Sequence, residues 1–372
     1  MTEVRDVAVV GAGLLGLAAA SELTAHGHDV VVLEQAEVGH AAAGSKGSCR
    51  IFRLGYPDPG YVAAARRAGE LWRELEAESG RQLLWPTPQL SFGAGLRDVQ
   101  RAMAAAGAPG ELVSAAAVAD RFPGIRVPGP ALLEPGSAVL AADAALDVLA
   151  ARAGEIRTGT RVLSLADDGR RVTLRTPAGP VLARTAIVTA GPWSRGLLAT
   201  LGVAVPAGPT LEQVSYLGPV EAPPPPGSMP IFIRHDAQAP YGLPVPGSPL
   251  YKIGIHHSGP VTDPDAQDQS PDPALVTRLS EVAASVLPGY DPTPVATERC
   301  CYDNTPDEDF VLDRIGNVAI GCGTSGHGFK FGPLLGRWLA ALATGGPDGP
   351  PVPLRQRFAA GRFQPPRTAH RA

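Results

Sequence analysis

The feature that most constrains the fold is a glycine loop near the N-terminus that follows a short apolar run. Residues 7–10 are apolar and mostly β-branched, which suits a strand buried on both faces, and Gly11-x-Gly13-x-x-Gly16 follows at once. Gly11 permits a tight turn, Gly13 lets a pyrophosphate approach the backbone, and Gly16 allows a helix to pack closely on the strand. The segment therefore predicts a strand, a phosphate-binding turn and a helix.

A second parallel strand is predicted over residues 29–33, and it ends at Glu34, 18 residues past Gly16. A carboxylate at this place accepts hydrogen bonds from ribose hydroxyls in dinucleotide-binding folds. Strand, loop, helix, second strand and acid together favour an α/β fold with a Rossmann-type domain over a chance glycine pattern in a chain with 44 glycines.

Length and composition exclude several classes of protein. The 372 residues suffice for two domains with sizeable cores, and a net charge of -4 argues against a nucleic-acid partner. Four cysteines make no disulfide framework, and no apolar run reaches the roughly 20 residues that span a bilayer. The histidine pairs lack cysteine or carboxylate ligands at useful spacing, so no metal site is expected. We expect a soluble, cytoplasmic protein without a membrane partner.

Periodicity places further elements along the chain. Apolar residues recur at helical spacing over 61–79, and helical pattern resumes at 141–153. Strands are expected over 161–165, 171–176, 181–189, 310–313 and 317–322, with a terminal helix from Leu334. Between 211 and 255, alternating strands with proline breaks are typical of an antiparallel sheet. We therefore expect a discontinuous dinucleotide-binding domain (1–84, 141–212 and 309–372) and an antiparallel-sheet substrate domain inserted into it (85–140 and 213–308).

Four parts of the chain carry a resemblance to a known family. They are the opening glycine loop and the segments 44–53, 251–256 and 300–330, the last with Cys-Cys-Tyr-Asp-Asn-Thr-Pro-Asp and Gly-Thr-Ser-Gly-His-Gly-Phe-Lys. With these, the chain resembles the monomeric sarcosine oxidase family, in the D-amino-acid oxidase superfamily of FAD proteins. The family includes sarcosine, N-methyltryptophan and pipecolate oxidases. It implies FAD as cofactor, a monomer, and a secondary or cyclic amino acid as substrate.

The resemblance also implies which residues bind the cofactor. The expected contacts are Gly11, Gly13, Gly16, Glu34, Ser45, Arg50, Val162, Gly191, Cys300, Gly323, Gly326, Gly328, Phe329 and Lys330. In the family, a cysteine in a Cys-x-Tyr pattern bonds covalently to the flavin 8-methyl carbon. Cys300 fits that pattern, with Cys301 as the competing candidate. Attack by the thiolate needs a lowered thiol pKa, which we expect Arg299 to assist.

Substrate residues follow from the same resemblance. Arg53 and Lys330 occupy the positions that bind the amino-acid carboxylate, Arg through its planar fork and Lys as a compact charge. Tyr241 and Tyr302 are expected to complete the substrate contacts. For Tyr241, a packed tyrosine with a satisfied hydroxyl remains an alternative.

Catalytic residues are implied at a third set of positions. Lys252 matches the family lysine beside flavin N5 that promotes the reaction of reduced flavin with dioxygen, and a cation there stabilises developing superoxide. His256 lies four residues on and matches a histidine near the substrate amine, where it can adjust charge or proton state. Arg50 is expected to offset negative charge on the reduced flavin ring.

The function expected is therefore FAD-dependent oxidation of a secondary or cyclic amino acid. Hydride transfer to flavin N5 gives an imine, and dioxygen restores the flavin with release of hydrogen peroxide. Three alternatives remain open from the sequence. One is a pathway-specific desaturase of a cyclic imino acid, another is an NAD-dependent dehydrogenase on the same glycine fingerprint, and the third is a flavin-binding protein without turnover.

Overall fold

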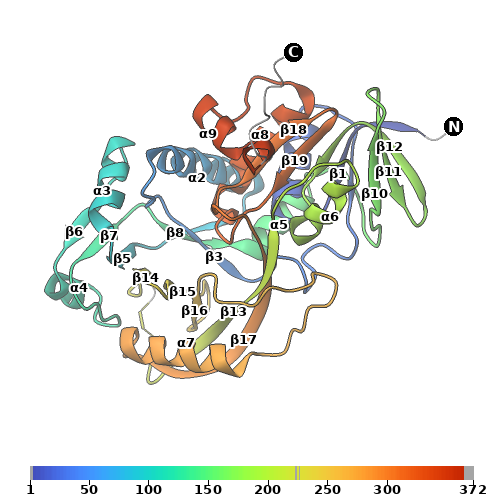
Figure 1. Cartoon of the computed structure of the whole chain (residues 1–372). Helices are drawn as coiled ribbons and strands as arrows, with labels where there is room; N and C mark the ends of the chain where they lie inside the picture. Colours follow the sequence, from blue (N-terminus) through green and yellow to red (C-terminus); the bar gives the residue numbers. More distant parts are fainter. Residues whose placement is uncertain (1–2, 223, 226, 364–372) are drawn as a thin grey trace, which may run out of the picture. The chain divides into compact units, whose positions relative to one another are not determined.

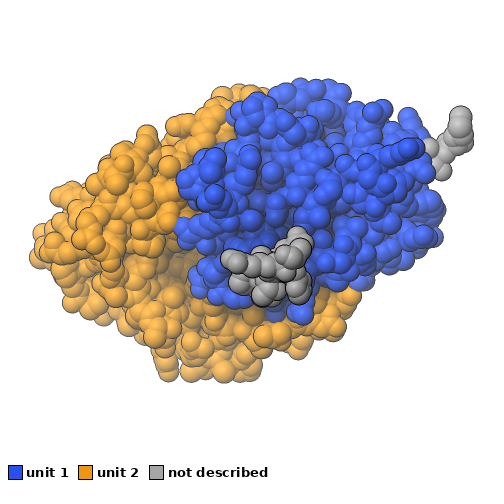
Figure 2. All heavy atoms as spheres, turned by 45° about the horizontal axis from the view of Figure 1, so that its top comes forward, with its two compact units in different colours: residues 1–45, 146–209, 302–372 blue, residues 46–145, 210–301 orange. Residues whose placement is uncertain are grey.

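The computed structural model describes residues 3–222, 224–225 and 227–363. Within them the chain forms two compact units, each built from separate stretches of sequence. Unit 1 comprises residues 1–45, 146–209 and 302–372, and unit 2 comprises residues 46–145 and 210–301 (Figure 2).

Unit 1 is built around a mixed sheet that starts from the glycine-loop strand (Figure 1). β1 (Val4–Val10) pairs in parallel with β2 (Val30–Leu33) on one side and with β12 (Gly179–Val188) on the other. The strand order is β10-β11-β12-β1-β2-β9, and β19 pairs with β12 and β18. The other strands are β9 (Glu155–Arg157), β10 (Ser164–Asp167), β11 (Val172–Thr176), β18 (Val311–Ile315) and β19 (Val318–Cys322).

Helices of unit 1 pack on this sheet and on each other. α1 (Leu14–Ala25) contacts α8 (Gly332–Thr344) closely, because a Cβ at Gly336 would lie only 2.5 Å from the Cβ of Ala18. The remaining helical segments are α6 (Ser194–Ala199), α9 (Val352–Phe358), η1 (Gly191–Trp193), η2 (Phe329–Phe331) and η3 (Ala360–Phe363). The residues of α5 (Ala142–Ala150) are divided between unit 2, up to Ala145, and unit 1, from Leu146. The parallel strands expected over residues 7–10 and 29–33, the helix expected after Gly16 and the terminal helix expected from Leu334 are confirmed.

Unit 2 contains an eight-stranded sheet of order β17-β13-β16-β15-β14-β5-β7-β6. Its strands are β5 (Gln89–Gly93), β6 (Glu111–Val113), β7 (Ala131–Glu134), β13 (Gly208–Pro219), β14 (Ile231–His235), β15 (Pro240–Pro244), β16 (Tyr251–Ile255) and β17 (Tyr290–Asn304). α7 (Pro273–Val286) covers one face of it, where its apolar residues join Leu217, Tyr251 and Ile253 in a buried cluster (Figure 1).

A second, three-stranded sheet of unit 2 has the order β3-β8-β4. Its strands are β3 (Cys49–Phe52), β4 (Leu84–Pro86) and β8 (Ala138–Ala141), and the helices of this unit are α2 (Pro59–Ser79), α3 (Leu96–Ala105) and α4 (Ala115–Arg121) besides α7. α2 begins where the Asp58 carboxylate caps the N–H groups of Gly60 and Tyr61, and it ends at Gly80 in the left-handed region.

Several expected domain bounds and one expected strand differ from the structure. Residues 141–145 and 210–212, expected in the dinucleotide-binding domain, belong to unit 2, and residues 302–308, expected in the substrate domain, belong to unit 1. Residues 46–84, expected in the dinucleotide-binding domain, belong to unit 2, because β3 and β4 both pair with β8 and Phe52 packs against Gly69 of α2. The strand expected over 161–165 is displaced to β10 (Ser164–Asp167), since this strand pairs antiparallel with β11. Local periodicity does not reveal which strand another strand pairs with, so neither the pairing with β8 nor the pairing with β11 could be predicted.

Candidate active site

The glycine loop of unit 1 has the geometry that a pyrophosphate requires. Gly11 has φ +97°, and a Cβ there would lie 2.6 Å from the carbonyl oxygen of Thr189. A Cβ at Gly16 would lie 2.0 Å from the carbonyl oxygen of Gly11. Both positions therefore need glycine, for the left-handed turn and for helix contact. Gly13, the N-cap of α1, has no side chain of its own to cap the helix, so the start of α1 presents N–H groups that suit a phosphate.

Ser45 and Glu34 hold this loop from either side. The Ser45 hydroxyl accepts a hydrogen bond from the Leu14 N–H at 3.0 Å. The buried Glu34 carboxylate accepts from the N–H of Ala12 at 2.7 Å and of Ala36 at 3.1 Å. A carboxylate offers about four acceptor positions, so Glu34 retains acceptor capacity for ribose hydroxyls. The residues present thus fit a dinucleotide.

Two other expected cofactor residues lie in unit 1. Val162 is 6% exposed and belongs to the hydrophobic cluster beneath β1, β2 and β12. Gly191 has φ +50° and begins η1, directly after the carboxyl end of β12. Because ligands of parallel sheets bind outside the carboxyl ends of the strands, Gly191 lies at the appropriate end of this sheet.

The C-terminal glycine loop is fixed by Asp303, a residue not singled out in the sequence. Its carboxylate accepts from the N–H groups of Gly323 at 2.7 Å and Thr324 at 3.0 Å, and from the Thr324 hydroxyl at 2.6 Å. Burial raises the pKa of Asp303, whereas these three hydrogen bonds lower it. Asp303 therefore positions the start of the loop that carries the expected cofactor contacts.

The rest of this loop is tightly packed. Gly326 has φ +72°, and a Cβ there would lie 2.0 Å from the Tyr302 ring, so the ring rests directly on the glycine backbone. Gly328 packs against the Thr324 side chain, and Phe329 begins η2. Lys330 is 5% exposed and donates to the His327 carbonyl oxygen at 2.6 Å, so its ammonium is held at a fixed place.

In unit 2, Lys252 is buried, not solvent-facing as a strand lysine usually is. It is 4% exposed, and its Nζ donates to the Cys49 carbonyl oxygen at 3.2 Å and lies 5.6 Å from the centre of the Tyr216 ring. Burial lowers the pKa of Lys252, an effect that the nearby Cys49 opposes. The ammonium is thus desolvated and directed, as electrostatic catalysis requires.

Arg50 and Cys300 share the surroundings of Lys252. Arg50 donates to the Cys49 carbonyl oxygen at 2.9 Å and to the Lys46 carbonyl oxygen. The expectation that the pKa of Cys300 is lowered is wrong. Burial raises it, while Arg50 and Lys252 only partly oppose this effect.

Arg299 does not have its expected role either. Its guanidinium donates to the carbonyl oxygens of Asp268, Ser270 and Leu211, which keeps it on other partners. Cys300 is partly exposed, whereas Cys301 is buried at 2% exposure. Alternation along β17 therefore separates the two thiols.

Arg53 is supported by a buried carboxylate that the sequence did not reveal. The guanidinium lies 4.1 Å from the centre of the Tyr56 ring and donates to the Gly55 carbonyl oxygen. Glu134 accepts from the N–H groups of Leu54 and Gly55, the latter at 2.9 Å, and fixes the turn after Arg53. Burial raises the pKa of Tyr56 to about 12.

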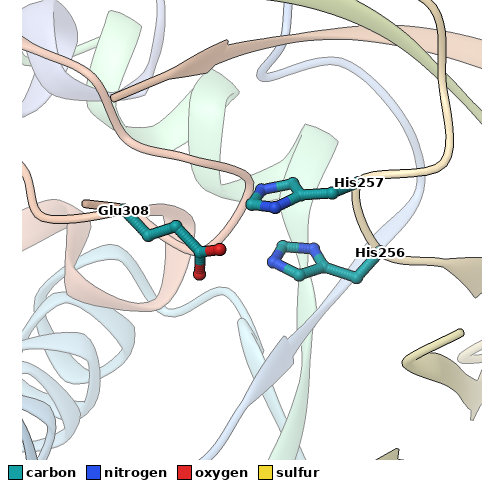
Figure 3. A group of neighbouring side chains, drawn as sticks. All are labelled: His256, His257 and Glu308. Atoms are coloured by element: carbon teal, nitrogen blue, oxygen red, sulfur yellow. The ribbon is translucent and has the colours of Figure 1, made fainter. Parts of the chain in front are cut away.

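Tyr241 and His256 lie on neighbouring strands of the large sheet. Tyr241 pairs with Gly254, where a Cβ would lie 2.6 Å from the Tyr241 ring, so the ring covers the glycine backbone. His256 follows β16, and its ring stacks on that of His257 with centroids 3.9 Å apart, as Figure 3 shows. His257 has φ +54°, which turns the chain sharply after this strand.

The chain belongs to the family of FAD dependent oxidoreductases (DAO), whose profile matches residues 6–342. FAD is accordingly the cofactor that the glycine loops and Glu34 fit. Among known proteins, the chain is 34% identical to peroxisomal sarcosine oxidase of Mus musculus, over 92% of this chain and 93% of that protein. It is 33% identical to monomeric sarcosine oxidase of Bacillus sp. (strain NS-129), over 92% of this chain and 93% of the relative.

Solved structures agree with this family. NikD, described as an unusual amino acid oxidase essential for nikkomycin biosynthesis, superposes with a TM-score of 0.83 at 26% identity, over 96% of this chain and 98% of that one. The fold class and the family expected from the sequence are confirmed. Within the described residues, no helix combines the length and apolar character that crossing a membrane demands.

Proposed function

We propose that this chain is an FAD-dependent oxidase of a secondary or cyclic amino acid. The observation that carries the proposal is the buried Lys252 ammonium, held at the Cys49 carbonyl oxygen close enough to Arg50 and Cys300 for their charges to act on its pKa. Among the described residues, Lys252 forms no ion pair with a carboxylate. A buried cation without such a partner is costly, so it indicates an electrostatic function. The relatives named sarcosine oxidase and N-methyl-L-tryptophan oxidase support the substrate class.

Bound FAD supplies the redox chemistry: it accepts a hydride from the carbon next to the substrate nitrogen, leaving an imine, and passes the electrons to dioxygen, which yields hydrogen peroxide. The protein contributes binding, orientation and charge. Lys252 is proposed to stabilise negative charge that develops on dioxygen. This role favours an oxidase over a dehydrogenase.

Arg53 and Lys330 are proposed to bind the substrate carboxylate. Arg53 offers a planar pair of N–H donors on a turn that Glu134 fixes, and Lys330 is a buried ammonium with few rotamers left. Tyr241 and Tyr302 would contact the substrate, and His256 would adjust the charge or the proton at the amine. A fixed carboxylate orients the carbon that loses hydride.

We propose Cys300 as the covalent attachment point of the flavin. Cys300 is partly exposed and lies close to the cationic Arg50 and Lys252, which favour its thiolate form. Cys301 is buried on the other side of β17 and lacks that exposure. The name monomeric sarcosine oxidase of one relative supports a monomer.

The experiment is the absorbance spectrum of the purified protein, followed by its intact mass after denaturation. We expect a flavin spectrum and a denatured mass that includes one FAD. Sarcosine, proline and pipecolate, added anaerobically in turn, should then identify a substrate by bleaching the flavin. A colourless protein of unmodified mass that added FAD does not alter would contradict the proposal and favour a nicotinamide enzyme.

A further inference from the structure

One face of the large sheet of unit 2 carries Tyr241 and Lys252, two of the residues proposed for chemistry. Cross-strand partners place their side chains on the same face, and Ser91, Ile233, Tyr241 and Gly254 pair in turn across β5, β14, β15 and β16. Lys252 is two residues from Gly254 and so belongs to this face as well. We call it the Tyr241 face.

The opposite face is mostly apolar, although Ser215 and Arg234 also belong to it through their pairing with Ile253 and Phe92. Leu90, Phe92, Phe232, Tyr251 and Ile253 point to it, and they form one buried cluster with α7. The Tyr241 face bears polar side chains on β5 and β14, of which Gln89 and Ser91 are buried and His235 is partly buried. Gln89 and Ser91 are two residues apart on β5, and His235 is two residues past Ile233 on β14.

Two of these polar groups are incompletely satisfied. Gln89 is 0% exposed and donates from Nε2 to the Ser91 hydroxyl at 3.1 Å, but its Oε1 is buried without a partner among the described residues. The Nε2 of His235 is likewise buried and unpartnered within the described part of the chain. An unpaired buried polar group destabilises a fold, so both atoms need a hydrogen-bonding partner from outside the fold.

Arg53, which is proposed to bind the substrate carboxylate, lies near Gln89, Ser91 and His235, which we call the polar row. The charge of Arg53 acts on the pKa values of both His235 and Glu134, and Glu134 is the cross-strand partner of Gln89. The row is thus close to the place where the amino-acid carboxylate is proposed to bind. Burial, reinforced by Arg53, lowers the pKa of His235 to about 4, so its ring is neutral at pH 7.

We propose that Gln89, Ser91 and His235 bind a neutral hydrogen-bonding group on the side chain of the substrate, such as a carboxamide or a hydroxyl. Arg53 and Glu134 have opposite charges near these residues, so neither a cationic nor an anionic side chain is favoured there. An aliphatic side chain would leave the buried polar atoms unpaired. This inference rests on the proposed function and adds its substrate class: amino acids with a polar, uncharged side chain.

The test compares substrates of equal shape. Racemic N-methylasparagine is measured against N-methylleucine, and racemic N-methylserine against N-methyl-2-aminobutyrate, with sarcosine as the substrate that lacks a side chain. We expect kcat/KM to favour the polar member of at least one pair by about tenfold or more, as sites built for hydrogen bonding do. In the Gln89→Met, Ser91→Ala double variant, this ratio should fall to about threefold or less.

Ser215→Ala is the matched control. Ser215 is 1% exposed with an unpartnered hydroxyl in the described structure, but it pairs with Ile253 and so belongs to the apolar face. We expect its substrate ratio to equal that of the wild type. Unfolding temperatures separate folding from recognition, because apolar groups of similar shape at Gln89 and Ser91 should leave the fold as stable or more stable. If the double variant does not fold, the substrate ratio is measured in Gln89→Met alone.

The outcomes distinguish this inference from the proposed function. Oxidation of sarcosine together with equal or better use of the aliphatic substrates would overturn the polar-side-chain inference and leave the oxidase intact. An unchanged ratio in the folded double variant would also overturn it. If no N-methyl or cyclic amino acid bleaches the flavin, the proposed function fails, and the inference fails with it.

Discussion

The ammonium of Lys252 donates a hydrogen bond to the carbonyl oxygen of Cys49, 203 positions away in the sequence, at 3.2 Å. Lys252 belongs to β16 of the large sheet and Cys49 to β3 of the small sheet, so the contact joins the two sheets of unit 2. A backbone carbonyl fixes the direction of the ammonium without neutralising it. The cation is thereby kept available for the negative charge that forms when dioxygen is reduced.

Replacing Lys252 by Met should slow reoxidation by dioxygen far more than anaerobic reduction by substrate. Met retains the length of the side chain but removes the charge, so the fold should tolerate the change better than the chemistry. Stopped-flow absorbance of the flavin measures the two half-reactions separately. Lys252→Arg, which keeps a cation, should retain more of the oxygen reaction than Lys252→Met. Equal losses in both half-reactions of Lys252→Met would remove the proposed role.

Replacing Cys300 by Ser should leave the FAD extractable, whereas Cys301→Ser should leave it attached. The reason is that only Cys300 combines partial exposure with the cationic Arg50 and Lys252 nearby. Because burial raises the pKa of Cys300, attachment of FAD to the apoprotein should also accelerate as pH rises and the thiolate fraction grows. Intact mass after acid precipitation measures both effects. Retention of FAD in Cys300→Ser would assign attachment to another residue.

Local pattern sufficed for the parts of the fold that a short window determines. The glycine loop, β1, β2 and α2 follow from periodicity and from residues such as Gly11 whose backbone only glycine adopts readily. A short stretch of sequence does not show which strand it pairs with. For this reason the expected domain bounds place residues 46–84 in the wrong unit.

The candidate site divides in the same way. Residues within motifs, such as Lys252 and Lys330, could be singled out because their neighbours match a family. Glu134 and Asp303 could not, because each acts through backbone N–H groups that are remote in sequence, and any residue can supply those. The prediction that the pKa of Cys300 is lowered is wrong, because the sequence shows the neighbouring charges but not the burial that raises this pKa.

Replacing Glu134 by Ala should lower the free energy of unfolding by about 2 kcal/mol or more and weaken the binding of carboxylate inhibitors. The N–H groups of Leu54 and Gly55 and the Ser137 hydroxyl would lose their acceptor inside the fold, and the turn after Arg53 would loosen. Urea unfolding and inhibitor titration measure the two effects. Glu111→Ala, at an exposed glutamate on neighbouring β6, is the control and should change neither. Unchanged inhibitor binding in a destabilised Glu134→Ala would restrict Glu134 to a structural role.

Replacing Asp303 by Ala should release FAD more readily, because Gly323 and Thr324 would lose the carboxylate that holds the start of the C-terminal loop. We expect the free energy of unfolding to fall by about 2 kcal/mol or more, since hydrogen bonds to a charged group are lost in a buried place. To separate noncovalent retention from attachment, FAD binding is measured in the Cys300→Ser background. Asp168→Asn, in an exposed turn, is the control. Equal FAD affinity with and without Asp303 would contradict the positioning role.

The pH dependence of stability should report on His235. Its pKa is about 4 in the folded protein and 6.5 in the unfolded chain, mainly because burial disfavours the charged ring. Between these values the unfolded state binds more protons than the folded state, so stability rises with pH across this window and falls on acidification. The difference corresponds to about 3 kcal/mol lost between pH 7 and pH 4. His235→Phe should therefore lose less stability than the wild type over this range, measured by urea unfolding at several pH values. His26→Gln, at an exposed histidine, should follow the wild type. Parallel pH profiles for His235→Phe and the wild type would show that His235 is not held neutral by burial, and the polar row would then carry a titrating charge.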